Sequence, residues 1–182
     1  METHTWQPRL ENELVLLRPM EQSDYEALYR AASDPLIWAQ HPAYNRHKRE
    51  EFDVFFAESL ASGKSFVVID KLTNQIIGST RYYDYDPEAS SIKIGFTFLD
   101  RAHWGGSFNY AKKQLLIDYA FRFVDTVIFE IAETNIRSRK GNSRFGIEEA
   151  EHFLKEIKGK YYPYISYRLT PELWKQAKRM RA

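Results

Sequence analysis

The chain has 182 residues, 43% hydrophobic and 28% charged, with 26 basic and 25 acidic residues and no cysteine. This length supports one well-buried core, so we expect a single domain over residues 1–182. A net charge of +1 argues against nucleic-acid partners and an acidic membrane surface, and the lack of cysteine excludes disulfides, a thiol nucleophile and thiolate metal sites.

The N-terminal residues 1–13 are polar and lack the apolar segment of a secretory signal. No later apolar run has the length needed to span a bilayer. We therefore expect a cytoplasmic protein without a membrane partner. The five histidines lack the spacing of metal ligands, and we expect no metal.

The first half of the chain predicts a strand, two helices and a loop between the helices. Residues 14–19 form a short apolar strand that ends at a proline, and Ser23 begins a capping-box pattern for a helix that runs to about Ala32. Residues 36–46 are irregular and bear aromatic side chains. Apolar residues then recur with helical spacing over 52–60, before a Ser-Gly stop.

The next part of the chain predicts an antiparallel meander of three strands. These strands cover residues 66–70, 75–85 and 91–99, and they are separated by turns at 71–74 and at Asp86-Pro87. The pattern therefore changes from helices to a sheet before the middle of the chain.

Residues 101–109 read Arg-Ala-His-Trp-Gly-Gly-Ser-Phe-Asn and precede a predicted helix over 110–124. Adjacent glycines allow a ligand to approach the backbone, and a helix that starts directly afterwards directs its free N–H groups at an anion. A plain turn is the commoner reason for a Gly-Gly pair before a helix. A phosphate site and a turn both remain open from this segment alone.

The C-terminal part predicts further alternation. A strand covers residues 126–132, and Asn135 can cap the helix that follows. Strands are then expected near 147–157 and over 162–169. Thr170-Pro171 opens a terminal helix, since proline suits the first helical turn.

The order of several short motifs resembles that of the GCN5-related N-acetyltransferases over nearly the whole chain. These motifs are Leu17-Arg18-Pro19, Ile77-Gly78, Ile94-Gly95-Phe96, Trp104-Gly105 and Asn135-Ile136-Arg137-Ser138-Arg139. The chain looks most like the branch that acetylates ribosomal-protein N-termini. The resemblance implies a mixed α/β fold with a central, mostly antiparallel sheet that splays open between two neighbouring strands, where acetyl-coenzyme A lies as the co-substrate.

The resemblance also implies which residues hold acetyl-coenzyme A. The backbone of Thr97, Phe98 and Leu99 would pair with the pantetheine arm as an added strand. The backbone N–H groups of Trp104, Gly105, Gly106, Ser107, Phe108 and Asn109 would hold the pyrophosphate. Asn135 and Ser138 lie three residues apart on one helix face, although a helix cap explains Asn135 equally well. Arg139 is the best candidate in a basic patch with Arg137, Lys140 and Arg144 for the 3′-phosphate, and a solvated face is the simpler explanation of that patch.

The chain departs from the family pattern at three places. Ser107 replaces a glycine of the phosphate loop, and Asn109 replaces its terminal Gly/Ala. Lys93 stands where many relatives carry a glutamate base, and a lysine ammonium cannot accept a proton. The helix after Asn135 carries Phe145 but no tyrosine to protonate the leaving thiolate, and Gly141 is expected to interrupt that helix.

Acetyl transfer still requires a group that accepts a proton from the amine. His41 in the loop, Asp84 at a strand end and Ser138 are the catalytic candidates, while Trp38, His41 and Tyr83 are candidates for the acceptor site. Turn capping is the simpler role for Asp84, and packing is the simpler role for Tyr83.

These observations predict an N-acetyltransferase that moves the acetyl group directly to a primary amine of a protein N-terminus or a small molecule. A covalent acyl-enzyme has little support without a cysteine or a Ser/His/Asp arrangement. The alternative is a non-catalytic acyl-CoA-binding sensor or interaction module. A mononucleotide-binding protein is disfavoured because the Gly-x-x-x-x-Gly-Lys-Ser/Thr pattern is absent. Aromatic residues over 161–167 suggest a possible homodimer surface that the sequence does not distinguish from core.

Overall fold

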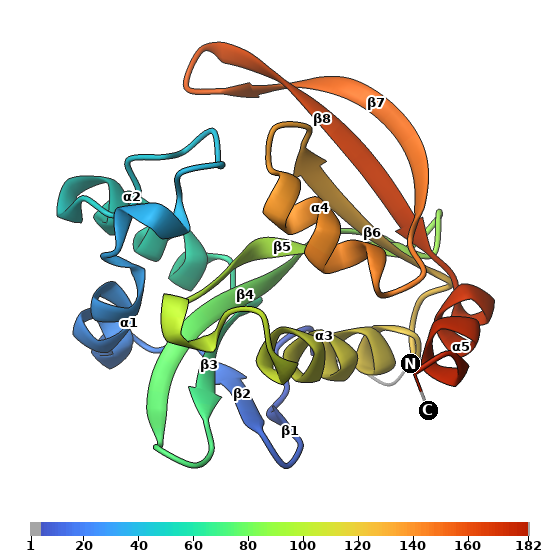
Figure 1. Ribbon diagram of the computed structural model, residues 1–182, viewed down its shortest axis with the longest axis horizontal. Helices are drawn as coiled ribbons and strands as arrows, with labels where there is room; N and C mark the ends of the chain where they lie inside the picture. Colours follow the sequence, from blue (N-terminus) through green and yellow to red (C-terminus); the bar gives the residue numbers. More distant parts are fainter. Residues whose placement is uncertain (1–4, 182) are drawn as a thin grey trace.

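A computed structural model describes residues 5–181, and within that range the strands form one eight-stranded sheet in the order β1-β2-β3-β4-β5-β6-β8-β7 (Figure 1). The strands are β1 (Leu10–Glu11), β2 (Val15–Pro19), β3 (Ser65–Asp70), β4 (Gln75–Asp86), β5 (Ser91–Leu99), β6 (Thr126–Ala132), β7 (Glu148–Ile157) and β8 (Lys160–Leu169). The helices are α1 (Tyr25–Ala32), α2 (Arg49–Ala61), α3 (Ser107–Ala120), α4 (Ile136–Ser143) and α5 (Pro171–Arg179), with 3₁₀ turns η1 (Gln22–Asp24), η2 (Pro35–Ile37) and η3 (Arg101–His103). This confirms the mixed α/β fold expected from the sequence.

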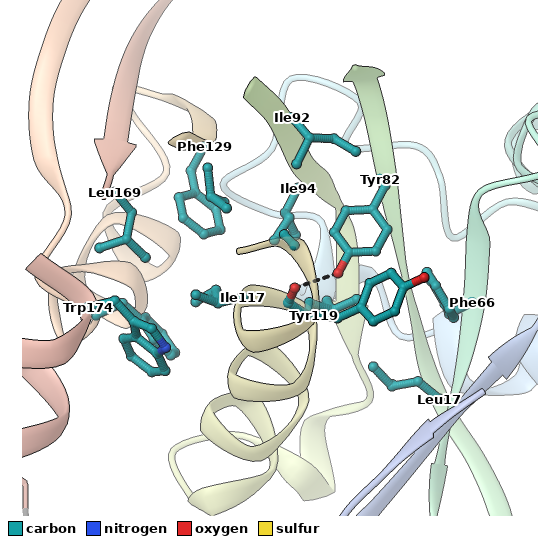
Figure 2. Packing of buried hydrophobic residues seen from close by; sticks show 14 of the residues in the cluster. Leu17, Phe66, Tyr82, Ile92, Ile94, Ile117, Tyr119, Phe129, Leu169 and Trp174 are labelled. Atoms are coloured by element: carbon teal, nitrogen blue, oxygen red, sulfur yellow. Dashed lines mark hydrogen bonds between the residues drawn. The ribbon is translucent and has the colours of Figure 1, made fainter. Parts of the chain in front are cut away.

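The sheet separates two apolar cores. Strand β3 shows this most clearly, because Phe66 and Val68 belong to the core under α3 and α5, whereas Val67 and Ile69 belong to the core under α1 and α2. Side chains alternate across a strand, so a strand that is buried on both faces contributes to both cores. Tyr82 of β4 lies in the first core and donates a hydrogen bond to the Leu116 carbonyl of α3 (Figure 2).

The sheet splays open between β5 and β6. These two strands are parallel and pair only over Ser91–Lys93 and Thr126–Ile128. Beyond that point β5 stays paired with β4, and β6 stays paired with β8. The remainder of β5 and the remainder of β6 therefore expose backbone edges to each other across a gap, as the resemblance implied.

A β-bulge shapes the open edge of β5. Two steps along β4, from Ser79 to Arg81, face three steps along β5, from Phe98 to Gly95. Phe96 takes up the extra residue with a left-handed φ of 51°. Next to it, a Cβ atom on Gly95 would lie 2.8 Å from the Tyr83 ring, so a larger residue at this position would displace that ring.

The helix boundaries differ from the sequence-based expectation at two places. Helix α3 begins at Ser107 rather than at 110 and ends at Ala120, because Gly106 is its N-cap and residues 121–124 form a turn. Helix α4 continues through Gly141 and ends at Ser143, so this glycine does not interrupt it. The single domain drawn over 1–182 stays a prediction, and its ends at 1–4 and 182 lie outside the described residues.

Candidate functional site

A cavity of about 550 Å³ lies at the open edge of β5. Its wall combines the end of β5, the segment before α3 with the first turns of that helix, residues 135–145 around α4, and the loop around Trp38. We call it the large cavity. Its position between α3 and α4 means that two helix N-termini and one strand edge face the same space.

The large cavity has a strongly basic wall although the whole chain has a net charge of only +1. Within residues 5–181, its lining contains no aspartate or glutamate and includes Lys112, Lys113, Arg137, Lys140, Arg144 and Arg181. A concave surface lined by one sign of charge concentrates its field on a ligand of the opposite sign. The large cavity therefore suits a polyanion.

The start of α3 supplies unpaired backbone donors to the large cavity. Gly105 has a left-handed φ of 71°, which favours glycine, and open space surrounds it. Gly106 caps α3 without a side-chain hydrogen bond to the first turn. The first N–H groups of a helix have no intrahelical partner, so those at residues 107–109 are available to an anion.

A chain of hydrogen bonds links α4 to α3 through residues that line both cavities. The Asn135 side chain accepts from the Ser138 N–H at 3.1 Å and so caps α4. The Asn142 side-chain amide donates to Ser138, at 2.7 Å to its carbonyl and 3.3 Å to its hydroxyl oxygen. Lys113 donates to the Asn142 side-chain oxygen and lies over the Phe129 ring at 4.7 Å. Burial holds the pKa of Lys113 well below its usual range.

A second cavity of about 100 Å³ occupies the gap between β5 and β6. We call it the inner cavity. It adjoins the large cavity, because seven residues line both: Trp38, His41, Thr97, Lys113, Asn135, Ser138 and Asn142. A ligand arm that follows the β5 edge in the large cavity would therefore end at the inner cavity.

Glu130 of β6 is the one acidic residue, among those described, that lines the inner cavity. Its side chain is 9% exposed and receives Lys93 at 2.6 Å and Lys155 at 2.6 Å. Burial by itself raises the pKa of Glu130, but the hydrogen bonds from the two lysines outweigh burial and lower the pKa below its usual value. The carboxylate is thus held ionised at neutral pH.

His41 lines both cavities as a neutral ring. Burial, together with the positive charges of Arg46, Lys155 and Arg137, lowers its pKa to about 3. The Ala43 N–H donates to Nδ1 at 2.9 Å, so the neutral ring carries its proton on Nε2. The ring therefore has an N–H donor at Nε2 and is a weak base, and the catalytic role of His41 stays a prediction.

The structure brings together most of the residues predicted to form the site. Nine predicted cofactor residues line the large cavity: Thr97, Phe98, Leu99, Trp104, Gly105, Gly106, Asn109, Asn135 and Ser138. The acceptor candidates Trp38 and His41 line both cavities. Ser107 and Phe108 lie in the first turn of α3 but do not line either cavity, and Phe108 packs on His103.

Two further candidates lie outside both cavities. The Asp84 carboxylate is 63% exposed and pairs with Lys93 at 3.0 Å, so it is a partner of Lys93 rather than a cavity group. The Tyr83 ring packs on Phe96 at 5.1 Å. Neither residue lines a cavity, and Asp84 has a left-handed φ of 47° at an irregularity in the pairing of β4 with β5.

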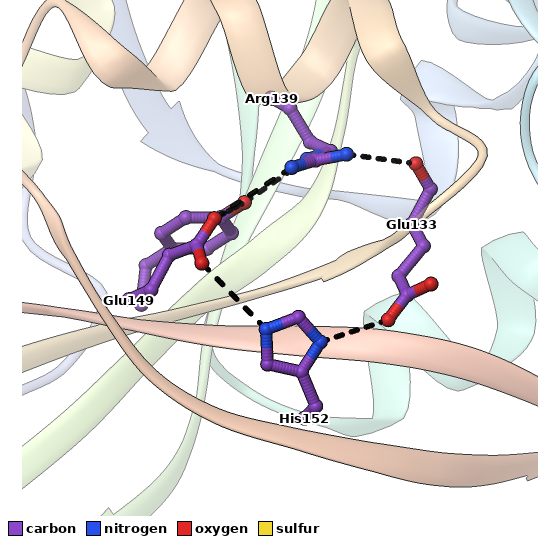
Figure 3. A network of polar contacts seen from close by, with 5 residues as sticks. Glu133, Arg139, Glu149 and His152 are labelled. Atoms are coloured by element: carbon purple, nitrogen blue, oxygen red, sulfur yellow. Dashed lines mark hydrogen bonds and ion pairs between the residues drawn. The ribbon is translucent and has the colours of Figure 1, made fainter.

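Arg139 does not line the large cavity, in contrast to its predicted role at the 3′-phosphate. Its guanidinium turns away from the large cavity toward β7 and β8, where it donates to Tyr167 at 3.1 Å and to the Glu133 carbonyl and lies 3.6 Å from Glu149 (Figure 3). His152 connects Glu133 and Glu149 in the same network. The basic side chains of α4 that line the large cavity are Arg137, Lys140 and Arg144.

Sequence reasoning did not identify several charged residues of the site. Glu130, Arg46, Lys112, Lys113 and Arg181 line one or both cavities although none belongs to a short motif. One feature of the sequence could have identified two of them: Lys112 and Lys113 lie on the otherwise apolar face of a predicted helix. Lys112 is fully buried without a hydrogen-bond partner, and burial lowers its pKa to about 7.

Comparison with known proteins agrees with this geometry. The sequence model of the acetyltransferase (GNAT) domain matches residues 15–148. The chain belongs to this family. An N-acetyltransferase named p20 from Bacillus licheniformis, itself described as uncharacterized, is 30% identical over 117 residues, which cover 62% of this chain and 65% of p20.

Solved GNAT structures share the fold at lower sequence identity. A GCN5-related N-acetyltransferase from Brucella melitensis superposes with a TM-score of 0.79 at 21% identity, covering 98% of this chain and 88% of its own. The microcin C7 self-immunity acetyltransferase MccE, solved with acetyl-CoA and AMP, gives a TM-score of 0.74 at 15% identity, covering 87% of this chain and 93% of its own. In residues 5–181 of the present GNAT protein, no helix is both long and apolar enough to cross a membrane.

Proposed function

We propose that this GNAT protein transfers the acetyl group of acetyl-CoA directly to a primary amine. The observation that carries the proposal is the pair of adjoining cavities. One is long and lined by basic residues without an acidic residue among those described, and the other is small and contains a buried carboxylate. This arrangement fits a phosphate-bearing donor on one side and an amine on the other.

The residues of the large cavity fit acetyl-CoA in charge and in backbone geometry. The start of α3 offers free N–H groups for a pyrophosphate, and Lys140, Arg144 and Arg181 supply positive charge for a further phosphate. The exposed edge of β5 can pair with the amides of the pantetheine arm. The Leu99 carbonyl is already bonded to the Trp104 indole at 2.9 Å, and the Phe98 carbonyl faces Gly78 of β4, which leaves Thr97 and the Leu99 N–H as the backbone partners.

Acetyl-CoA supplies the thioester that an amine can attack, and this chain supplies groups for the sulfur side of the reaction. Asn142 donates to the Ser138 oxygen, so the Ser138 O–H remains free to donate toward the leaving sulfur. Lys113 lies behind Asn142 and lines both cavities. Together these side chains take the place of the tyrosine that this helix lacks.

On the amine side, Glu130 holds the acceptor and takes its proton, directly or through water. A carboxylate oxygen has more than one acceptor site, so the pairs with Lys93 and Lys155 leave capacity for an ammonium. Many relatives carry a glutamate at the position of Lys93. In this chain Lys93 instead orients the Glu130 carboxylate, which takes over the role of that glutamate. Alignment of thioester and amine can supply roughly 7 to 11 kcal/mol of the barrier, which allows a weak base to suffice.

The second candidate function is a CoA-binding module without turnover. The observation that favours it is the pairing of Glu130 with two lysines, since a lowered pKa makes the carboxylate a weaker base. Membership of the ribosomal-protein branch and a homodimer also stay proposals. For a homodimer, the hairpin of β7 and β8 offers exposed Leu154 and Tyr161, whereas Tyr164 and Tyr167 are buried.

One experiment separates these functions. Acetyl-CoA at about one hundred times its dissociation constant should stabilise the protein by roughly 2.7 kcal/mol in a thermal melt. Mass spectrometry of a mixed amine and peptide library incubated with acetyl-CoA should then show products heavier by one acetyl group. Stabilisation without any product would favour the module, and no stabilisation would contradict both functions.

A further inference from the structure

Arg46 stands out among the residues that the proposed reaction leaves unused. It lies in the loop before α2, lines the inner cavity and stacks on two buried rings, with its guanidinium carbon 5.1 Å from the Trp38 centroid and 4.6 Å from the Phe55 centroid. Stacking on the ring faces leaves the five N–H donors at the edge of the guanidinium free to bond. The two rings therefore hold the guanidinium in place, with its N–H donors beside the cavity. We call these donors the Arg46 fork.

No protein acceptor uses these donors. Within residues 5–181, neither a hydrogen bond nor an ion pair reaches the Arg46 side chain. Other arginines of the chain do have partners, such as Arg18 with Asp24 at 2.6 Å and Arg49 with Glu26 at 2.8 Å. Burial lowers the pKa of Arg46 to about 10, which leaves it a cation at neutral pH. A partly desolvated cation without a partner is a feature typical of ligand sites.

The charges around Arg46 leave the inner cavity with excess positive charge. Glu51 and Glu58 of α2 attract Arg46 only over a longer distance, and the Glu51 carboxylate pairs with Lys158. On the opposite side of the cavity, Lys93 and Lys155 already balance Glu130. Burial is the main cause that raises the pKa of Tyr164 to about 12. Arg46 lowers this pKa and Glu130 raises it, so Tyr164 interacts electrostatically with both charged groups of the cavity.

We propose that the acceptor is a small amine that also carries an anionic group, a carboxylate, phosphate or sulfonate, which the Arg46 fork binds while the amine faces Glu130. This inference rests on the proposed function and names its substrate class. Arginine binds such anions with two parallel hydrogen bonds, which fixes their orientation as well as their charge. The volume of about 100 Å³ limits the bound end of the acceptor to a few heavy atoms.

Matched amines test the proposal with the full-length protein and acetyl-CoA. The pairs are β-alanine with β-alaninamide, and phosphoethanolamine with ethanolamine, because each pair differs in the anionic group. The wild-type protein should acetylate the anionic member with a kcat/KM at least about 10-fold higher. A tripeptide with an N-terminal aspartate, compared with its asparagine counterpart, shows whether the anion can also belong to a peptide.

Arg46→Met should lower kcat/KM for the anionic amines by roughly 10- to 100-fold and for their neutral counterparts by less than about 3-fold, with the KM for acetyl-CoA unchanged. Turnover of the neutral amines also reports that the variant is folded. Arg46→Lys keeps the charge but loses the fork, and it should fall between the two. Arg49→Met is the matched control, since Arg49 also stacks on a ring, at 4.3 Å from Tyr29, but lies outside both cavities.

Equal use of both members of each pair, or an equal loss on both in Arg46→Met, would overturn the proposal while leaving the acetyltransferase function intact. Calorimetry in the presence of CoA distinguishes a failure of the proposed acetyl transfer from a failure of the proposed anion site. If no amine is acetylated but phosphoethanolamine binds to the wild type and not to Arg46→Met, the proposed reaction fails and the anion site stands. If no anionic amine is acetylated or bound, the anion site fails.

Discussion

The phosphate end of the large cavity and the inner cavity are built from very different parts of the chain. One continuous stretch, residues 104–109, supplies the turn, the glycines and the helix start that face an anion. The inner cavity instead draws on the loop near Arg46, on β5 and β6, on α3 and α4, and on Tyr164 of β8. The first region is a continuous segment whose backbone geometry suits an anion. The second exists only where distant elements meet, and it contains charges of both signs.

The difference in charge is as informative as the difference in construction. The large cavity has basic residues and no acidic one among the residues described, so its electrostatics favour a polyanion. The inner cavity combines the guanidinium of Arg46 with the carboxylate of Glu130. A ligand that carries both a positive and a negative group fits there. In the proposed reaction the positive group is the acceptor amine. Donor binding and acceptor choice should therefore respond to separate sets of mutations.

The largest effect is expected at the inner cavity. Glu130→Gln removes the charge that holds the acceptor amine, and kcat/KM should fall by about 100-fold or more while the dissociation constant for acetyl-CoA stays within about 2-fold. Steady-state kinetics and calorimetry measure the two quantities. Glu133→Gln, three residues further along the chain and paired with His152 at the surface, is the matched control. A comparable loss in that control, or full activity of Glu130→Gln, would contradict the role of Glu130.

A tenfold effect is expected at the large cavity. Arg144→Met should weaken acetyl-CoA binding by about 10-fold, since it removes a cation beside the phosphate region, and kcat at saturating donor should change little. Arg139→Met should change the same dissociation constant by less than about 2-fold, because Arg139 faces β7 and β8. Calorimetry at two salt concentrations measures both. The opposite ranking would return the phosphate role to Arg139.

The smallest effect concerns stability and its pH dependence. The pKa of Lys112 is lowered to about 7 in the folded chain against about 10.5 when unfolded, so its charge disfavours the folded state fully below about pH 7. Lys112→Met should therefore raise Tm by about 3 °C at pH 6, and the gain should vanish as the pH rises toward about 10.5. Lys112→Met should also bind acetyl-CoA more weakly, since Lys112 lines the large cavity.

Thermal melts over that pH range measure the effect of Lys112, with the exposed Lys160→Met as control. A gain in Tm that stays constant from pH 6 to 10 would show that the methionine improves packing instead. Stronger acetyl-CoA binding by Lys112→Met would place the Lys112 charge outside the donor site.

Local chemistry made much of this molecule predictable. The alternation in residues 66–99, the Asn135 cap and the Thr170-Pro171 helix start all correspond to elements of the structure. The capping box expected from Ser23 lies two residues earlier, between Glu21 and Asp24. The mixed α/β fold and the family also followed, because the motifs occur in a fixed order along the chain. Boundaries were less accurate, as at α3, where Gly106 rather than Asn109 precedes the first helical residue.

Side-chain direction was not predictable. Arg139 and Arg144 look equivalent in the sequence, but helix α4 turns one toward β7 and the other toward the large cavity. Lys93 seemed to remove the carboxylate from the reaction site, yet the pairing of β5 with β6 places the ammonium of Lys93 2.6 Å from Glu130. Which face a residue presents depends on packing between elements, and no single segment encodes it.

The sequence by itself therefore determined the elements, the family and the backbone segment suited to phosphate, because each depends on residues that are near neighbours in the chain. Only the tertiary structure decided which charges meet in the inner cavity. Arg46 and Glu130 are 84 positions apart in the printed sequence, and their joint lining of one cavity arises from the splay of β5 from β6 and from the loop that closes over it. The proposed choice of acceptor depends on that meeting of distant side chains.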